Sequence, residues 1–106
     1  IVLAKRAGNR LFHMHFNDNH GSWDDDMIAG TVHSTTYIET LYWLQRTNYE
    51  GWLSMDQYPY REEAAEASGE SICWLQSYEK IVRENYREIS DLTQQNNAVA
   101  TSRFLR

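Results

Sequence analysis

The sequence has few of the features that mark disulfide frameworks, membrane spans or nucleic-acid surfaces. Cys73 is its only cysteine, so no internal disulfide can form, which fits a reducing compartment. No apolar run approaches the roughly 18 to 20 residues that cross a bilayer, and we expect no leader. Lys and Arg number 10 against 15 Asp and Glu, giving a net charge of -5 that argues against nucleic-acid binding. We therefore expect a cytoplasmic protein with no membrane or nucleic-acid partner.

The length and composition of the chain are typical of one folded domain. The chain has 106 residues, of which 42% are hydrophobic and 13% aromatic, and this content excludes a disordered chain. It begins at Ile1, without an initiator Met, on what resembles the end of an apolar helix. We therefore expect a fragment of a longer protein.

The hydrophobic pattern predicts alternating helices and strands. Gly8-Asn9 is a stop signal after a first helix, and in the next strand Leu11, His13 and His15 alternate with Phe12, Met14 and Phe16. Pro59 ends the second strand. The predicted elements are a helix over 1–7, a strand over 11–16, a helix over 35–47, a strand over 52–57 and a helix over 62–85.

This order predicts an α/β fold with two βα units, whose strands are parallel and joined by a right-handed crossover. A complete (β/α)8 barrel needs about 250 residues, so the chain would supply about a quarter of one. We therefore predict the C-terminal part of a TIM barrel over residues 1–89. Residues 90–106 would form a helical tail or arm.

Candidate metal ligands lie where barrel enzymes carry their active sites, at the C-terminal strand ends and the loops that follow. His15 is near the end of the first strand, Asp24 and Asp26 are in its loop, and Asp56 ends the second strand. All four are therefore expected on one rim. Imidazole and carboxylate without thiolate suit Mn²⁺, Co²⁺ or Mg²⁺.

Simpler interpretations stand beside this one. An Asp-rich turn is often only solvated, and we expect this of Asp25. His13 is equally well a hydrogen-bonded core residue, and His20 and His33 are expected on the surface. Asp56 is harder to explain in this way, because a carboxylate inside an apolar strand is costly to bury without a partner.

The strand LFHMHFN, residues 11–17, and the loop DDDMIAG, residues 24–30, carry a resemblance to a known family. They resemble the metal-dependent sugar isomerases of the xylose-isomerase-like barrel superfamily, and are closest to the L-rhamnose isomerase type. The similarity spans residues 8–85. Xylose isomerases have Asp at the position of His15 and Lys at that of Tyr58, so the resemblance does not imply xylose specificity.

The resemblance implies a two-metal aldose-ketose isomerase. His15 and Asp56 match ligands of the structural metal, and Asp24 and Asp26 match ligands of the catalytic metal, which promotes a hydride shift between two sugar carbons. His13 and Tyr58 are the candidate sugar-binding residues, although Tyr58, like Tyr60 and Arg61, equally well packs the loop. The family's other acidic ligands precede Ile1, so we expect the fragment alone to be inactive and its parent to be a homo-oligomer.

Other functions stay open. The chain could be a non-catalytic barrel remnant that binds a partner protein through Trp43, Trp52 and Trp74. It could also belong to a sugar epimerase, or to a metal-dependent hydrolase of the endonuclease IV type, which the net acidity disfavours.

Overall fold

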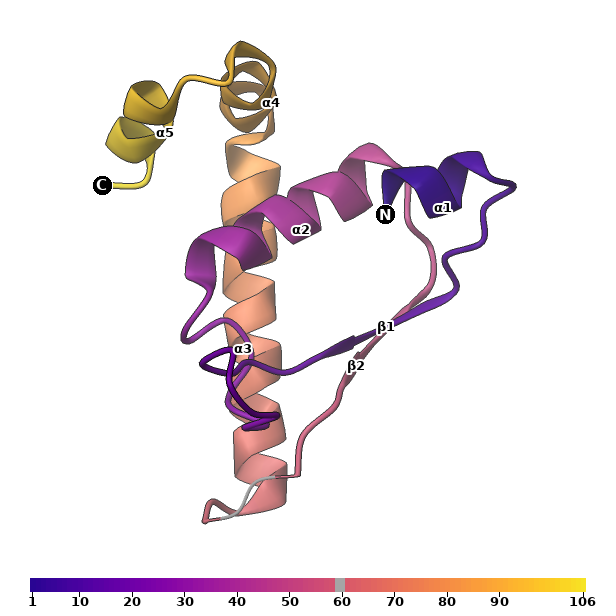
Figure 1. Cartoon of the computed structure of the whole chain (residues 1–106), viewed down its shortest axis with the longest axis vertical. Helices are drawn as coiled ribbons and strands as arrows, with labels where there is room; N and C mark the ends of the chain where they lie inside the picture. Colours follow the sequence, from indigo (N-terminus) through magenta and orange to yellow (C-terminus); the bar gives the residue numbers. More distant parts are fainter. Residues whose placement is uncertain (59–60) are drawn as a thin grey trace.

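The structure is a computed structural model that describes residues 1–58 and 61–106. Over these ranges the chain forms a small α/β unit with two strands and five helices (Figure 1). Their order is α1 (Val2–Arg6), β1 (His13–Phe16), α2 (Ser34–Arg46), β2 (Trp52–Met55), α3 (Ala64–Glu84), α4 (Tyr86–Gln95) and α5 (Ala98–Phe104). The predicted end of the second strand at Pro59 and the predicted role of Tyr60 lie outside the described residues.

The two strands pair in parallel, as the βα order predicted. His13 lies opposite Trp52 and His15 opposite Ser54. The ladder continues beyond the strand end, because the Asp56 N–H donates to the Phe16 carbonyl at 3.0 Å. No third strand joins this sheet within residues 1–58 and 61–106, so the predicted barrel stays a prediction.

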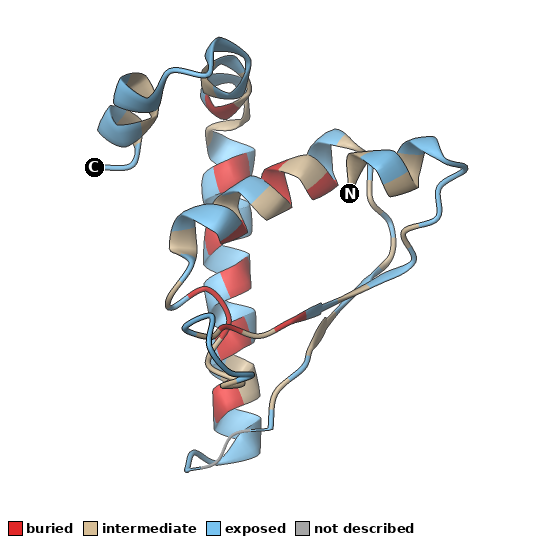
Figure 2. Ribbon diagram, in the orientation of Figure 1, coloured by how far each residue is buried: buried red, intermediate tan, exposed pale blue. Residues whose placement is uncertain are grey.

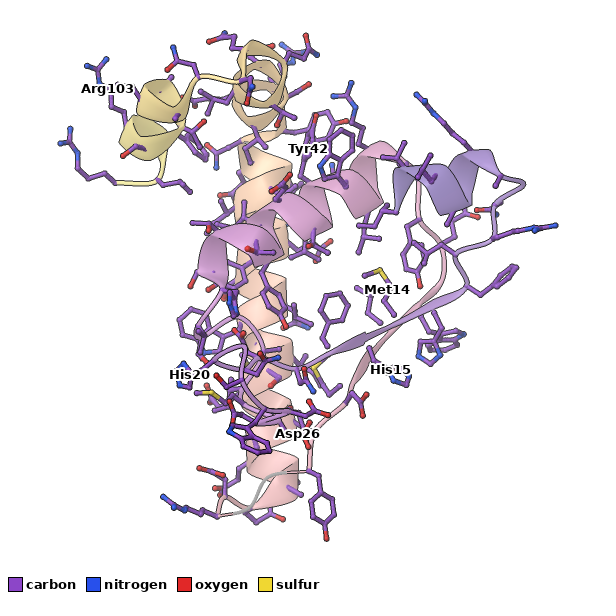
Figure 3. The ribbon with its side chains drawn as sticks, viewed as in Figure 1. Met14, His15, His20, Asp26, Tyr42 and Arg103 are labelled. Carbon is purple, nitrogen blue, oxygen red and sulfur yellow. The ribbon has the colours of Figure 1, made fainter. Side chains whose placement is uncertain are left out.

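Helices cover one face of the sheet and leave the other open. Phe16 is buried, with its ring 5.7 Å from that of Tyr37 on α2, and Tyr37 lies 6.3 Å from Tyr78 on α3. In Figure 3, Met14 points from β1 toward α2 and His15 points to the opposite side. Figure 2 shows buried residues along the facing sides of α2 and α3. In the two strands only Phe16 is buried, and the other residues are exposed or intermediate. The predicted alternation is therefore confirmed from His13 to Phe16, but it is wrong at the two preceding residues, because Leu11 packs against the core and Phe12 is exposed.

The helices after β2 differ in detail from the prediction. α3 begins after Glu63, whose carboxylate accepts the Glu66 N–H, two residues later than the predicted start at residue 62. Residues beyond 90 are helical, in α4 and α5, and the predicted boundary at residue 89 falls inside α4. Within the described part of the chain, no helix combines the length and apolarity needed to span a membrane.

Candidate metal-binding rim

His15 and Asp56 meet at the C-terminal ends of the two strands. Their side chains share a face because His15 is paired with Ser54, and Asp56 follows Ser54 by two residues. His15 Nδ1 lies 3.2 Å from Asp56 Oδ2, and both side chains are more than half exposed. The structure therefore brings together these two predicted ligands, which we call the strand-end pair.

His13 lies beside this pair. Its Nε2 is 2.6 Å from Ser54 Oγ, and its ring centre is 4.6 Å from that of His15. The residue is exposed on the open face of the sheet, so it is not part of the core formed by the described residues. Its predicted role in sugar binding stays a prediction.

Asp24 and Asp26 are brought together by one amide group. Asn17 Nδ2 donates to Asp24 Oδ1 at 3.2 Å and to Asp26 Oδ1 at 2.8 Å. Asp26 also accepts the backbone N–H of Tyr58 at 3.0 Å through Oδ2, so its carboxylate links the chain after β1 to the chain after β2. We call Asp24 and Asp26 the loop pair.

Asp26 adopts the left-handed backbone conformation, with φ of 48°. This conformation is uncommon for residues other than glycine, and it persists where surrounding contacts hold it. The bonds from Asn17 and Tyr58 supply such contacts. The Tyr58 side chain is itself exposed, and its predicted contact with a sugar stays a prediction.

The donor atoms of the strand-end pair and the loop pair suit a hard divalent cation, but each pair supplies only two ligands. Imidazole nitrogen and carboxylate oxygen are ligands that Mn²⁺, Mg²⁺ and Co²⁺ accept. The four predicted ligands form two pairs, and among the described residues no group of three or more His, Cys, Asp or Glu side chains is placed to hold a metal ion. Each pair therefore fits two ligands of an ion and leaves its remaining positions to other donors.

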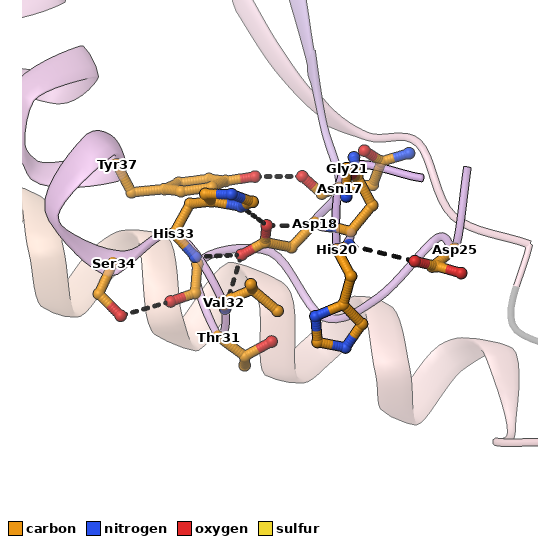
Figure 4. A network of polar contacts seen from close by, with 12 residues as sticks. Asn17, Asp18, His20, Gly21, Asp25, Thr31, Val32, His33, Ser34 and Tyr37 are labelled. Atoms are coloured by element: carbon orange, nitrogen blue, oxygen red, sulfur yellow. Dashed lines mark hydrogen bonds and ion pairs between the residues drawn. The ribbon is translucent and has the colours of Figure 1, made fainter. Parts of the chain in front are cut away.

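A buried carboxylate that the sequence analysis missed shapes the loop of residues 17–33. Asp18 is 2% exposed, and its two oxygens take part in four hydrogen bonds (Figure 4). Oδ2 accepts the N–H groups of Val32 at 2.8 Å and His33 at 3.0 Å, while Oδ1 accepts the Asn19 N–H at 3.0 Å and lies 2.6 Å from His33 Nδ1. We call this arrangement the Asp18 clasp, because it joins both ends of the loop.

The clasp determines the ionisation of Asp18. Burial alone would raise the pKa of this carboxyl, but hydrogen bonds from the His33 ring and from the backbone N–H groups of His33, Val32 and Asn19 outweigh it. The pKa of Asp18 therefore lies below its usual value, and the group is ionised at neutral pH. Its hydrogen-bonded oxygens act as structural acceptors.

Tyr37 extends the clasp to Asn17. Its hydroxyl donates to the Asn17 carbonyl, which fixes the residue whose amide holds the loop pair. Burial, followed by the charge of Asp18 and the neighbouring Tyr78, raises the pKa of Tyr37 to about 12. The phenol therefore stays protonated, as its role as donor requires.

A second contact fastens the loop to α3. Ser71 is fully buried, donates to Gln57 Oε1 at 2.8 Å and accepts the Ala29 N–H at 3.0 Å. Gln57 Nε2 in turn donates to the Met27 carbonyl at 3.1 Å. The loop is therefore held at both of its halves, and it is more than a solvated turn.

The other polar residues of the loop take distinct places. Asp25, which we expected to be only solvated, accepts the His20 backbone N–H at 3.1 Å. His20 is exposed, as expected. About half of the His33 side chain is exposed, as expected for a surface residue. Its ring also contacts Asp18 and forms part of the Asp18 clasp, which the sequence analysis did not predict.

Comparison of the chain with protein-family models, with curated proteins and with solved structures found no match.

Proposed function

We propose that this chain forms part of the metal-binding rim of a sugar isomerase with a barrel fold. In this proposal the strand-end pair binds one divalent cation and the loop pair binds a second, with Mn²⁺ as the favoured ion. The observation that carries the proposal is the presence of two pairs of oxygen and nitrogen donors, the strand-end pair and the loop pair, at or after the C-terminal ends of two parallel strands. Active sites of barrel enzymes lie at this end of the strands.

The two faces of the sheet support a barrel. Helices α2 and α3 pack on the face of Phe16, where the outer helices of a barrel would lie. The opposite face carries His13, His15 and Asp56, together with Trp52, which is 77% exposed. Parallel sheets are normally covered on both faces, so the open face would be the barrel interior, and further strands would supply the remaining metal ligands.

The residues of this chain would prepare the site in defined ways. Asn17 holds the two carboxylates of the loop pair together, and Tyr37 fixes Asn17. Bound metal would supply Lewis-acid polarisation of the sugar oxygens at the reacting carbons. His13 and Tyr58 would contact the sugar, and positioning of an open-chain sugar contributes to the rate by holding it near the reactive geometry.

The first test is Mn²⁺ binding to the 106-residue chain, measured from the loss of the free Mn²⁺ electron paramagnetic resonance signal. Asp24→Asn combined with Asp26→Asn should weaken Mn²⁺ binding by about tenfold or more, because an amide is a poorer ligand for a hard cation. Asp91→Asn, the same chemical change at an exposed site in α4, is the control. Equal Mn²⁺ affinity in the double variant and the control would contradict the proposed metal site.

The second test is activity in a longer protein that contains this sequence. Mn²⁺ should support interconversion of an aldose and its ketose, and the same double variant should abolish it. Exchange of deuterium from solvent into the product would distinguish proton transfer, as in an epimerase, from an internal hydride shift. Absence of any sugar conversion in the metal-loaded longer protein would refute the isomerase proposal.

A non-catalytic interaction module is the second candidate, and the exposure of Trp52 favours it. The other two tryptophans support it less. Trp43 lies over the Arg46 guanidinium at 5.6 Å, and Trp74 contacts Tyr78, with ring centres 5.6 Å apart. Under this alternative, Trp52→Ala should abolish association without any change in Mn²⁺ binding.

A further inference from the structure

The open face of the sheet carries a histidine pair whose geometry suits another class of metal. His13 and His15 are two residues apart on β1, where side chains of the same face begin about 6.6 Å apart. Their ring centres lie only 4.6 Å apart, with ring planes at 83°. The two imidazoles therefore lean toward one another.

In each imidazole ring, one nitrogen contacts a neighbouring side chain and the other nitrogen takes no part in that contact. His15 Nδ1 lies 3.2 Å from Asp56 Oδ2, and in the tautomer that carries its hydrogen on Nδ1 the carboxylate accepts this hydrogen and the lone pair resides on Nε2. His13 Nε2 is bonded to Ser54 Oγ, which leaves Nδ1 outside that contact. A carboxylate or hydroxyl on the far nitrogen is the usual support of a metal-binding histidine.

We propose that His13 and His15 form a two-imidazole chelate for a borderline transition-metal ion. Two imidazoles bound to one ion at an N–metal–N angle near 90°, with metal–nitrogen bonds of about 2.0–2.1 Å, have ring centres about 4.5 Å apart. The observed separation of 4.6 Å puts the two rings close enough for one ion to contact both. Exposure of the face leaves the remaining coordination positions to water.

The donor type selects the ion. Imidazole nitrogens are accepted by Cu²⁺, Ni²⁺ and Zn²⁺, and the general order of stability places Cu²⁺ above Ni²⁺ and Zn²⁺. Asp24 and Asp26 offer only oxygen, which suits harder ions, and they are not part of this chelate. The chelate does not depend on the proposed isomerase function. Because both proposals use His15, copper bound to the chelate would compete with a hard cation at the strand-end pair.

The test is calorimetric titration of the 106-residue chain with CuCl₂ in a buffer that does not coordinate copper. His13→Asn and His15→Asn should each weaken the tightest copper site by about tenfold or more, since either leaves a single imidazole. Asp56→Asn should weaken it less, because it removes only the group that orients His15. His20→Asn, at an exposed histidine outside β1, should bind copper as the unchanged chain does.

Spectra keep the test independent of any loss of folding. Electron paramagnetic resonance of the Cu²⁺ complex should show coupling to two imidazole nitrogens in the unchanged chain and to one in either single variant, with far-ultraviolet circular dichroism unaltered. Unchanged copper affinity in both single variants, or an equal loss in His20→Asn, would overturn the chelate. His13→Asn should leave Mn²⁺ binding intact and the Asp24 and Asp26 double variant should leave copper binding intact, so the two proposals can fail separately.

Discussion

The Asp18 clasp makes the sharpest prediction about stability. Asp18→Asn keeps the shape of the side chain but replaces one oxygen by an NH₂ group, and it removes the charge. If the remaining oxygen keeps the N–H groups of Val32 and His33, the NH₂ group meets the Asn19 N–H and the His33 ring. One buried donor then loses its acceptor, and the retained bonds lose their charge assistance.

The expected cost follows from these changes. A hydrogen bond to a charged group contributes about 1.5–3 kcal/mol and one between neutral groups about 0.5–1.5 kcal/mol, so the free energy of unfolding should fall by about 2–3 kcal/mol. Asp18→Ala, which removes all the acceptors, should cost about 3–5 kcal/mol. Urea denaturation at pH 7, followed by circular dichroism and by tryptophan fluorescence, measures both. Asp91→Asn on the surface of α4 is the matched control and should change the free energy of unfolding by less than about 0.5 kcal/mol.

The pH dependence gives an independent check. Because the pKa of Asp18 is lower in the folded protein, its contribution is fully present above the unfolded value of about 3.9 and is lost as the pH falls through the lower folded value. His33 and Tyr37 are the titratable groups that face it. The difference in stability between the unchanged chain and Asp18→Asn should therefore shrink below about pH 4. A difference below about 0.5 kcal/mol at pH 7, or one that is the same at pH 7 and pH 3, would refute the clasp.

Three further changes test the rest of the loop. Tyr37→Phe should remove the titration near pH 12 from the ultraviolet absorbance profile and lower the free energy of unfolding by about 1 kcal/mol. In the unchanged chain, the contribution of the raised Tyr37 pKa to stability is present below about pH 10 and is lost as the pH rises toward 12. Gly30→Ala should destabilise by more than Gly21→Ala, because both residues have positive φ but a Cβ at Gly30 would lie 2.5 Å from the Tyr78 ring; equal costs in thermal melts would contradict this contact. Ser71→Ala leaves the buried Ala29 N–H without its acceptor and should cost about 1–3 kcal/mol, and an unchanged urea midpoint would count against its role.

Much of the fold could be predicted because its signals are local. Alternation along residues 11–16, helical spacing over 35–47 and the strand before Pro59 gave the order of elements, and that order implied parallel pairing. The same reasoning placed His15 and Asp56 at one end of the sheet, where they form a hydrogen bond. Strand lengths were overestimated, because β1 and β2 pair over only four residues each, with one further backbone bond from the Asp56 N–H to the Phe16 carbonyl.

The clasp and the contact between Ser71 and Gln57 could not be predicted in the same way. Asp18 bonds to residues 14 and 15 positions later, and Ser71 bonds to Ala29 over 42 positions, so neither contact leaves a periodic pattern in the sequence. The one available signal was the length of the loop, since long loops in small domains are usually held by specific contacts. The start of helix α5 could not be predicted from the sequence either, because it depends on a cap from Asn97 within a polar run.

The dense run of aspartates after β1 is best understood as a division of roles by burial. Asp18 is enclosed by N–H donors and an imidazole, which occupy both of its oxygens, so it serves structure. Asp25 accepts a backbone N–H within its own turn. Asp24 and Asp26 share the Asn17 amide as a donor and lie nearer to solvent, and Asp26 accepts one further N–H, from Tyr58. Because their carboxylates are not enclosed as that of Asp18 is, the loop pair, rather than the aspartate-rich run as a whole, is where the metal proposal has to be tested.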